Sequence, residues 1–244
     1  MTKQLLFIGL DVDDNAFHAH FISEDGKVEG SFSCKPSTGK LLQKLEPLHQ
    51  GGADIRICYE ATYLGFSLHR DLTAKGYHCD VIAPSLIPEM PGNKIKTDRL
   101  DSQKLAQFYR SGLLTIVRVP NEEEETIRDL LRSRKFIVNQ IKDIKLHVNA
   151  LCRRMGLDYR RELGNNSSEY WTNPHFAWLR DKIKNSKNSS LSFNLEMLLF
   201  QLDQIKSNFN TYEEKIEQIS KSDVYKTKGQ FLMAQSIFGL SCSN

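Results

Sequence analysis

The chain has 244 residues, of which 40% are hydrophobic and 26% are charged, and its net charge is +3. This composition is typical of one folded domain with an extension, or of two small domains. No apolar run approaches the roughly 20 residues that span a bilayer, and the N-terminus lacks a signal-peptide cleavage region, so we expect no membrane association. Five cysteines without a Cys-x-x-Cys pair argue against a disulfide framework or zinc site and predict a cytoplasmic protein.

The first half of the chain alternates between short apolar runs and amphipathic segments. Three apolar runs in hairpin order are followed by alternating helical and extended patterns, which predicts a mixed α/β sheet. This order fits the ribonuclease-H-like (RuvC-like) fold. The expected strands are residues 5–12, 16–23, 28–35, 54–60 and 78–83, and the expected helices are 36–50, 63–75 and 98–111, with a loop over 84–97.

After Pro120 the pattern becomes that of long helices. Apolar residues recur at spacings of three and four over residues 127–151, with Arg134 as one polar position, and again over residues 195–219. Such seams predict coiled-coil helices that pair within one chain or between two, and the segments between them are polar. We therefore expect a first domain at residues 1–120 and a helical coiled-coil domain at residues 121–225, which would favour a homodimer or higher oligomer.

Four acids have the layout of a metal site. Asp11 and Glu60 each end an apolar run, while Asp98 and Asp101 are three residues apart at the start of the helix expected at 98–111. Acids at strand ends and on one helix face can converge on hard cations, and two Mg²⁺ ions are the usual requirement of phosphodiester chemistry. Each acid also has a simpler interpretation, since Asp98 and Asp101 could cap the helix and Asp11 could begin a turn.

Basic and aromatic residues suggest contacts with nucleic acid. Residues 128–161 contain ten Lys or Arg and three Asp or Glu, a local excess that can neutralise phosphates or simply form a solvated helix face. An aromatic patch at residues 170–178 could stack bases, although packing against the coiled coil is the favoured interpretation. The basic residues that we assign to phosphate contacts are Lys94, Lys96, Arg99, Arg128, Arg132, Arg153 and Arg154.

Three sequence segments resemble a known family. The segments IGLDVD at residues 8–13, CYEAT at 58–62 and KTDRLDSQKLA at 96–106 are similar to motifs of the DEDD transposases of the IS110 insertion-sequence family, which are related to Piv-type DNA invertases. The resemblance implies a RuvC-like catalytic domain whose metal-binding acids are Asp11, Glu60, Asp98 and Asp101. It also implies a dimerising coiled coil, DNA as substrate and a structured guide RNA.

The resemblance also implies a further C-terminal domain that carries a nucleophilic serine. Residues 236–240 are similar to the start of that domain, but Phe238 stands where the family has proline, and no serine before Asn244 matches the nucleophile. We therefore expect residues 226–244 to be the remnant of a truncated domain, and this chain alone to be incomplete as a transposase.

Two other functions stay open from the sequence. The chain could be a truncated, non-catalytic DNA- or RNA-binding dimerisation module that regulates transposition. It could also be a nuclease similar to the Holliday-junction resolvases, which the long heptad segment disfavours only weakly. A sugar kinase or actin-like ATPase would need an Asp-x-Gly-Thr phosphate turn after the first strand, and residues 11–14 lack it.

Overall fold

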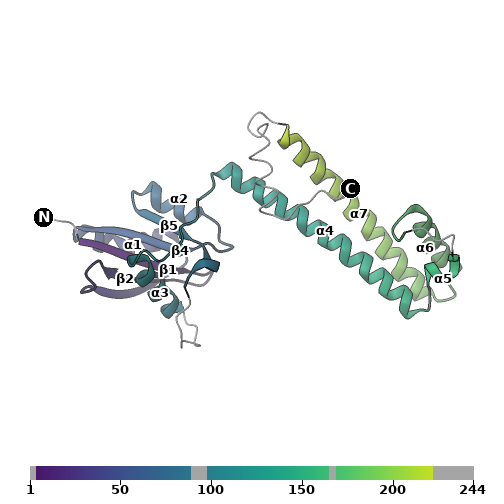
Figure 1. Cartoon of the computed structure of the whole chain (residues 1–244), viewed down its shortest axis with the longest axis horizontal. Helices are drawn as coiled ribbons and strands as arrows, with labels where there is room; N and C mark the ends of the chain where they lie inside the picture. Colours follow the sequence, from purple (N-terminus) through teal and green to yellow (C-terminus); the bar gives the residue numbers. More distant parts are fainter. Residues whose placement is uncertain (1–3, 89–97, 165–168, 222–244) are drawn as a thin grey trace. The chain divides into compact units, whose positions relative to one another are not determined.

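The computed structural model describes residues 4–88, 98–164 and 169–221, and the side chains of Asp98 and Arg99 lie outside the described part. The chain forms two compact units that divide between Val119 and Pro120. Its elements, labelled in Figure 1, are β1 Gln4–Val12, β2 Phe17–Ser23, β3 Glu29–Cys34, α1 Thr38–Gln50, β4 Ala53–Glu60, α2 Ser67–Ala74, β5 His78–Ile82, a 3₁₀ turn η1 Pro84–Leu86, α3 Asp98–Arg110, α4 Glu122–Arg154, α5 Tyr159–Leu163, α6 Asn173–Asn185 and α7 Ser189–Ser220.

The first unit contains a five-stranded mixed sheet. The strand order is β3-β2-β1-β4-β5, in which β2 is antiparallel to β1 and β3, and β4 is parallel to β1 and β5. The hairpin between β2 and β3 turns at Gly26, whose φ of +73° favours glycine. The prediction of a mixed α/β sheet is confirmed.

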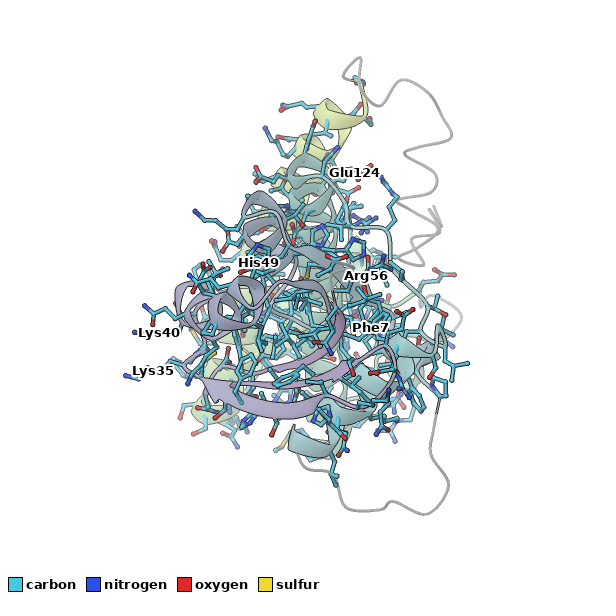
Figure 2. All side chains as sticks on the ribbon, turned by 90° about the vertical axis from the view of Figure 1, so that its left-hand side faces the viewer. Phe7, Lys35, Lys40, His49, Arg56 and Glu124 are labelled. Atoms are coloured by element: carbon cyan, nitrogen blue, oxygen red, sulfur yellow. The ribbon has the colours of Figure 1, made fainter. Side chains whose placement is uncertain are left out.

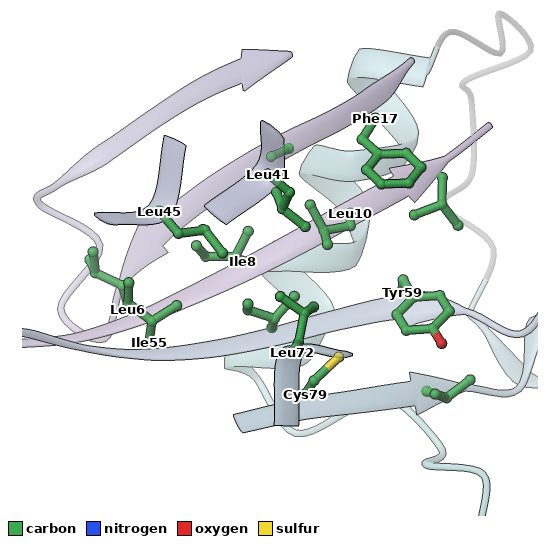
Figure 3. Packing of buried hydrophobic residues seen from close by; sticks show 14 of the residues in the cluster. Leu6, Ile8, Leu10, Phe17, Leu41, Leu45, Ile55, Tyr59, Leu72 and Cys79 are labelled. Carbon is green, nitrogen blue, oxygen red and sulfur yellow. The ribbon is translucent and has the colours of Figure 1, made fainter. Parts of the chain in front are cut away.

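Alternation along β1 separates the two faces of the sheet. Leu6, Ile8 and Leu10 pack under α1 and α2 together with Leu41 and Leu72, as Figure 3 shows. The residues between them face α3, and the ring of Phe7 lies 5.6 Å from that of Tyr109. Because successive side chains of a strand point to opposite faces, β1 is buried on both sides.

A close approach of α3 to β1 is possible because residue 9 is glycine. A Cβ atom built on Gly9 would lie 2.4 Å from the backbone nitrogen of Ala106 and 2.4 Å from the carbonyl oxygen of Ser102. Ser102, Leu105 and Ala106 are all buried. Helix α3 therefore rests directly on the backbone of β1.

The second unit is built on two long antiparallel helices. Residues 144–152 of α4 share one apolar cluster with residues 195–202 of α7, whereas Arg134 pairs with Glu213 and lies 5.1 Å from the ring centroid of Phe209. The two seams therefore meet within one chain, and Figure 1 shows α4 and α7 side by side with α5 and α6 at one end. Helix α4 begins with a capping box, in which Asn121 and Glu124 bond to each other's backbone N–H.

Some details differ from the sequence-based expectations. Helix α2 begins at Ser67 rather than at residue 63, because Gly65 adopts a φ of +69° that ends the preceding turn. The segment between the long helices is not only polar linker, since α5 and α6 occupy much of it. Leu131 is more deeply buried than the predicted seam residue Leu130.

Two further expectations concern the C-terminal residues and membrane-spanning helices. The remnant predicted at residues 226–244 lies outside the described residues. Within the described ranges, no helix is both long enough and apolar enough to cross a bilayer.

Candidate nuclease site

Strand register brings Asp11 and Glu60 to the same edge of the sheet. Leu10 is paired with Tyr59 across the parallel strands β1 and β4, so the next residues, Asp11 and Glu60, lie side by side near the carboxyl ends of these strands. By alternation both belong to the face that also carries Gly9 and Cys58, which is the α3 face. Both acids are half-buried. In open α/β sheets this carboxyl edge is the usual position of an active site.

Helix α3 runs in the direction opposite to β1. Tyr109 lies over Phe7, whereas the turn from Ser102 to Ala106 lies over Gly9. Two residues of a strand advance about 6.7 Å, which equals about four to five residues of a helix at 1.5 Å each. Moving two residues along β1 from Gly9 reaches Asp11. The same distance along α3, starting from the middle of the turn over Gly9 at residue 104, reaches about residue 100. The first turn of α3 therefore lies at the same edge as Asp11.

The two remaining acids belong to that first turn. Asp101 is half-buried on α3, next to the buried Ser102. Asp98 is the first residue of α3, and its side chain lies outside the described part. Among the described residues, no group of three or more His, Cys, Asp or Glu side chains is arranged to hold a metal ion. The structure thus brings Asp11 and Glu60 to one edge of the sheet and sets Asp101 on the helix that covers this face.

A histidine also lies at this edge. His18 of β2 pairs directly with Asp11 across the antiparallel ladder, and opposite residues of such a pair share one face of the sheet. The imidazole is half-buried. The sequence contained a signal for this histidine, since His18 and His20 alternate along β2, but only the register shows that His18 is the member opposite Asp11.

Cys58 is the thiol nearest in register to the acids, and it is chemically inert. Burial raises the pKa of Cys58 well above its ordinary value, and the charges of Cys79, Asp80 and Glu60 raise it further. A thiol that stays protonated at neutral pH is a poor nucleophile. The groups that can act at this edge are therefore carboxylates and an imidazole, and carboxylate oxygens are the ligands that Mg²⁺ prefers.

The predicted phosphate-binding residues are divided between the two units. Lys94 and Lys96 lie outside the described residues, and Arg99 lies on α3 with its side chain outside them. Arg128 is half-buried on α4, and Arg132 is exposed with its guanidinium 2.7 Å from Asp129. Arg153 and Arg154 are exposed in the last turn of α4.

Comparison with known proteins identifies the family. A family model described as a transposase, DEDD_Tnp_IS110, matches residues 8–155, which include all four predicted acids. The chain belongs to the IS110 family of DEDD transposases. The resemblance seen in the sequence motifs is confirmed.

Two proteins that carry transposase names align with most of the chain. A Sinorhizobium fredii protein named "Putative transposase y4qE" is 33% identical over 178 residues, which are 72% of this chain and 44% of that protein. The transposase of insertion sequence element IS1533 from Leptospira borgpetersenii is 27% identical over 228 residues, 93% of this chain and 64% of that protein. The chain therefore spans less than two thirds of the length of either relative.

Part of the chain is also similar in shape to a solved nuclease structure. The large terminase nuclease of thermophilic phage G20c covers 46% of this chain and 58% of its own chain, at 10% identity and a TM-score of 0.29. A score of this size is too low to indicate a shared fold.

Proposed function

We propose that this chain is the Mg²⁺-dependent nuclease part of an IS110-family transposase that acts on DNA in the cytoplasm. In this proposal the first unit is a ribonuclease-H-like domain, and Asp11, Glu60, Asp98 and Asp101 hold two Mg²⁺ ions. Phosphodiester cleavage and strand transfer, directed by a guide RNA as the family resemblance implies, would be the activity of the whole protein.

The observation that carries the proposal is the shared edge of β1, β4 and α3. Two carboxylates end adjacent parallel strands on one face, and the helix on that face runs antiparallel to β1, so that its acidic first turn lies at the same edge. The four residues occur in the chain order Asp, Glu, Asp, Asp, and all lie within the segment matched by the family. Strand order 3-2-1-4-5 with an antiparallel second strand supports the ribonuclease-H-like assignment.

The donor set fits Mg²⁺ in its chemistry, since all four side chains offer carboxylate oxygens. Two bound Mg²⁺ ions would activate a water or hydroxyl and would stabilise the charge on the leaving oxygen. The chain's own residues have the remaining tasks. Asp11 and Glu60 would contribute their carboxylates from the sheet, and Asp98 and Asp101 would contribute theirs from the first turn of α3.

Metal binding provides the first test. We expect Mg²⁺ and Mn²⁺ to raise the melting temperature of the chain and to give measurable binding heat, because a ligand that binds only the folded state stabilises it. Asp11→Asn and Glu60→Gln should abolish both effects. Asp54→Asn is the matched control, since Asp54 is an exposed acid on the same strand and face as Glu60 but at the opposite end. Equal metal binding by wild type and Asp11→Asn would refute the site.

Cleavage assays then separate the proposed function from its alternatives. Supercoiled plasmid, linear duplex and a four-way junction are incubated with Mg²⁺ and each variant. Cutting of supercoiled DNA that disappears in Asp11→Asn supports the transposase nuclease. Cutting confined to the junction would indicate a resolvase-like enzyme instead. Binding of nucleic acid without any cutting, together with absent metal binding, would indicate a non-catalytic regulatory module.

We also propose that the helical unit associates with a second copy of the chain. On α7 the exposed residues Phe193, Met197 and Phe200 follow helical spacing on one face, and Phe136 and Leu146 are exposed on α4. Exposed apolar residues arranged in this way are typical of a protein interface. Sedimentation should show a dimer that the double variant Phe193→Ser, Phe200→Ser converts to monomer. A monomeric wild type at micromolar concentration would exclude this interface.

A further inference from the structure

A pocket of about 300 Å³ lies at the end of the helical unit, where α4 gives way to α5 and α6. Its volume is at the lower limit of about 300–1,000 Å³ for small-molecule sites, which suits one mononucleotide-sized group. All its lining residues belong to the second unit. Those that matter for the argument below are Asn149, Arg153, Tyr159, Arg160, Tyr170 and His175.

Aromatic rings form the inner wall of the pocket. Tyr159 and His175 are almost fully buried, and their ring centroids are 4.7 Å apart. Tyr170 is only half-buried; its ring is tilted against that of Tyr159 at 5.6 Å and meets that of His175 edge-on at 4.9 Å. The buried rings fix the position of Tyr170, so a planar surface is held at the pocket at little cost in side-chain freedom.

Two exposed arginines, Arg153 and Arg160, also line the pocket. The Arg160 guanidinium lies 5.3 Å from the ring centroid of Tyr170, and both planar groups are surfaces on which nucleobases stack. Arg153 is exposed in the last turn of α4. Asp158 also lines the pocket, but its Oδ1 accepts hydrogen bonds from the backbone N–H groups of Arg160 and Arg161. That carboxylate is therefore occupied in capping α5.

The pocket also has polar groups suited to the edge of a base. The Asn149 side chain is half-buried in the wall and offers both a donor and an acceptor. His175 Nδ1 accepts the backbone N–H of Trp171 at 3.1 Å, so the ring proton belongs on Nε2. Burial lowers the pKa of His175 to about 4, which keeps the imidazole uncharged at neutral pH.

The backbone beside the pocket is in an unusual conformation. Among the described residues, Trp171 is the only non-glycine with positive φ, at +73°. A bulky residue rarely adopts this conformation, and such strain is concentrated at ligand sites. The hydrogen bond to His175 and the edge-on contact of the two rings at 5.1 Å hold Trp171 in place. The strained residue directly follows Tyr170, so its conformation helps to set where the Tyr170 ring lies.

We propose that this pocket holds one unpaired nucleotide of a single-stranded nucleic acid, with its base against Tyr170 and Arg160 and its phosphate on Arg153. A duplex cannot present a base in this way, because its bases are stacked and paired. The chemistry is shared by single-stranded RNA and single-stranded DNA, and the test below distinguishes these sources. The inference deepens the proposed function and depends on it only in taking nucleic acid as the partner.

The experiment measures binding without cleavage. The full chain is titrated, in EDTA, with fluorescently labelled single-stranded RNA, the same sequence as DNA, and the matching DNA duplex. We expect single strands to bind more tightly than the duplex. Both tryptophans of the chain, Trp171 and Trp178, belong to this aromatic region, so binding should also quench the intrinsic fluorescence. Tighter binding of RNA or of DNA identifies which strand uses the pocket.

Two variants and two controls decide the outcome. Arg160→Gln and Tyr170→Leu should each weaken single-strand binding about tenfold, the usual effect of losing one base-stacking group. Tyr170→Phe keeps the ring and should bind as wild type does. Arg180→Gln removes one positive charge from an exposed position on α6 outside the pocket, and it should weaken binding much less.

Several results would overturn the pocket. One is that Arg160→Gln and Arg180→Gln bind single strands with equal affinity. Another is that Tyr170→Leu binds single strands as tightly as wild type while its circular dichroism spectrum is unchanged. Equal effects on single strands and on duplex would reject it as well, since they would indicate a general charge effect. These results leave the metal site untouched, because binding in EDTA does not require it. Loss of metal binding in Asp11→Asn, conversely, leaves the pocket unaffected.

Discussion

Gly9→Ala is expected to separate α3 from the sheet. The new Cβ atom would lie 2.4 Å from two backbone atoms of α3, whereas ordinary contact begins at 3.4 Å, so the helix must move by about 1 Å to relieve the contact. Backbone atoms cannot rotate away as a side chain can. The backbone of Gly9 does not itself require glycine, because its φ is not positive, and the expected cost is therefore steric.

The loss of stability in Gly9→Ala can be estimated from the usual cost of adding a methyl group to a packed core. An inserted methyl group in a close-packed core costs about 1–3 kcal/mol, and replacing glycine in a strand recovers about 0.5–1 kcal/mol of entropy. We expect a net loss of about 1–2 kcal/mol in the free energy of unfolding of the first unit. A displacement of about 1 Å near the acids should lower DNA cleavage by about a hundredfold.

Hydrogen exchange of β1, β4 and α3 measures this effect directly. Tryptophan fluorescence should stay unchanged, because both tryptophans belong to the second unit. Gly39→Ala is the matched control, since a Cβ there meets only the Ser37 hydroxyl at 3.8 Å and should stabilise α1 by about 0.5–1 kcal/mol. If Gly9→Ala exchanges as slowly as wild type and keeps its metal binding, the close contact of α3 with β1 is wrong.

Three further predictions concern the second unit. The lowered pKa of His175, about 4 against its usual 6.5, means that the unfolded chain takes up a proton which the folded chain lacks, so the unfolding free energy should fall by roughly 1–3 kcal/mol as pH drops from 6.5 toward 4. The urea midpoint of unfolding, followed by tryptophan fluorescence, should depend less steeply on pH in His175→Gln than in wild type. An equal dependence on pH in the two proteins would contradict this prediction. Leu202→Ala, at a fully buried position, should cost about 2–5 kcal/mol in the same assay, whereas Gln201→Ala, at the neighbouring exposed position of α7, should cost under about 0.5 kcal/mol. Asn121→Ala breaks the capping box and should destabilise α4 by about 1 kcal/mol, with faster hydrogen exchange confined to its first turns as the check.

Local patterns predict the strands of the sheet and the two longest helices of this protein. The apolar run of β1, the hairpin order of the first three strands and the apolar spacing of α4 and α7 each depend on neighbours within a few residues, and the structure has strands and helices at these places. The family motifs are local as well, and the family assignment is confirmed. The two short helices α5 and α6 were missed because their aromatic residues are buried by packing against α4 and α7, which no local period reports.

Only the tertiary structure decided how these elements meet. The sequence predicted acids at two strand ends and at one helix start, but it could not say that β1 and β4 are neighbours with Leu10 opposite Tyr59, or that His18 faces Asp11. Nor could it reveal that α3 rests on Gly9, or that the seams of α4 and α7 close within one chain through contacts such as Arg134 with Glu213. Such contacts join residues tens of positions apart. Their free energy comes from burial and register across the whole fold, whereas a sequence pattern reports only the preferences of adjacent residues.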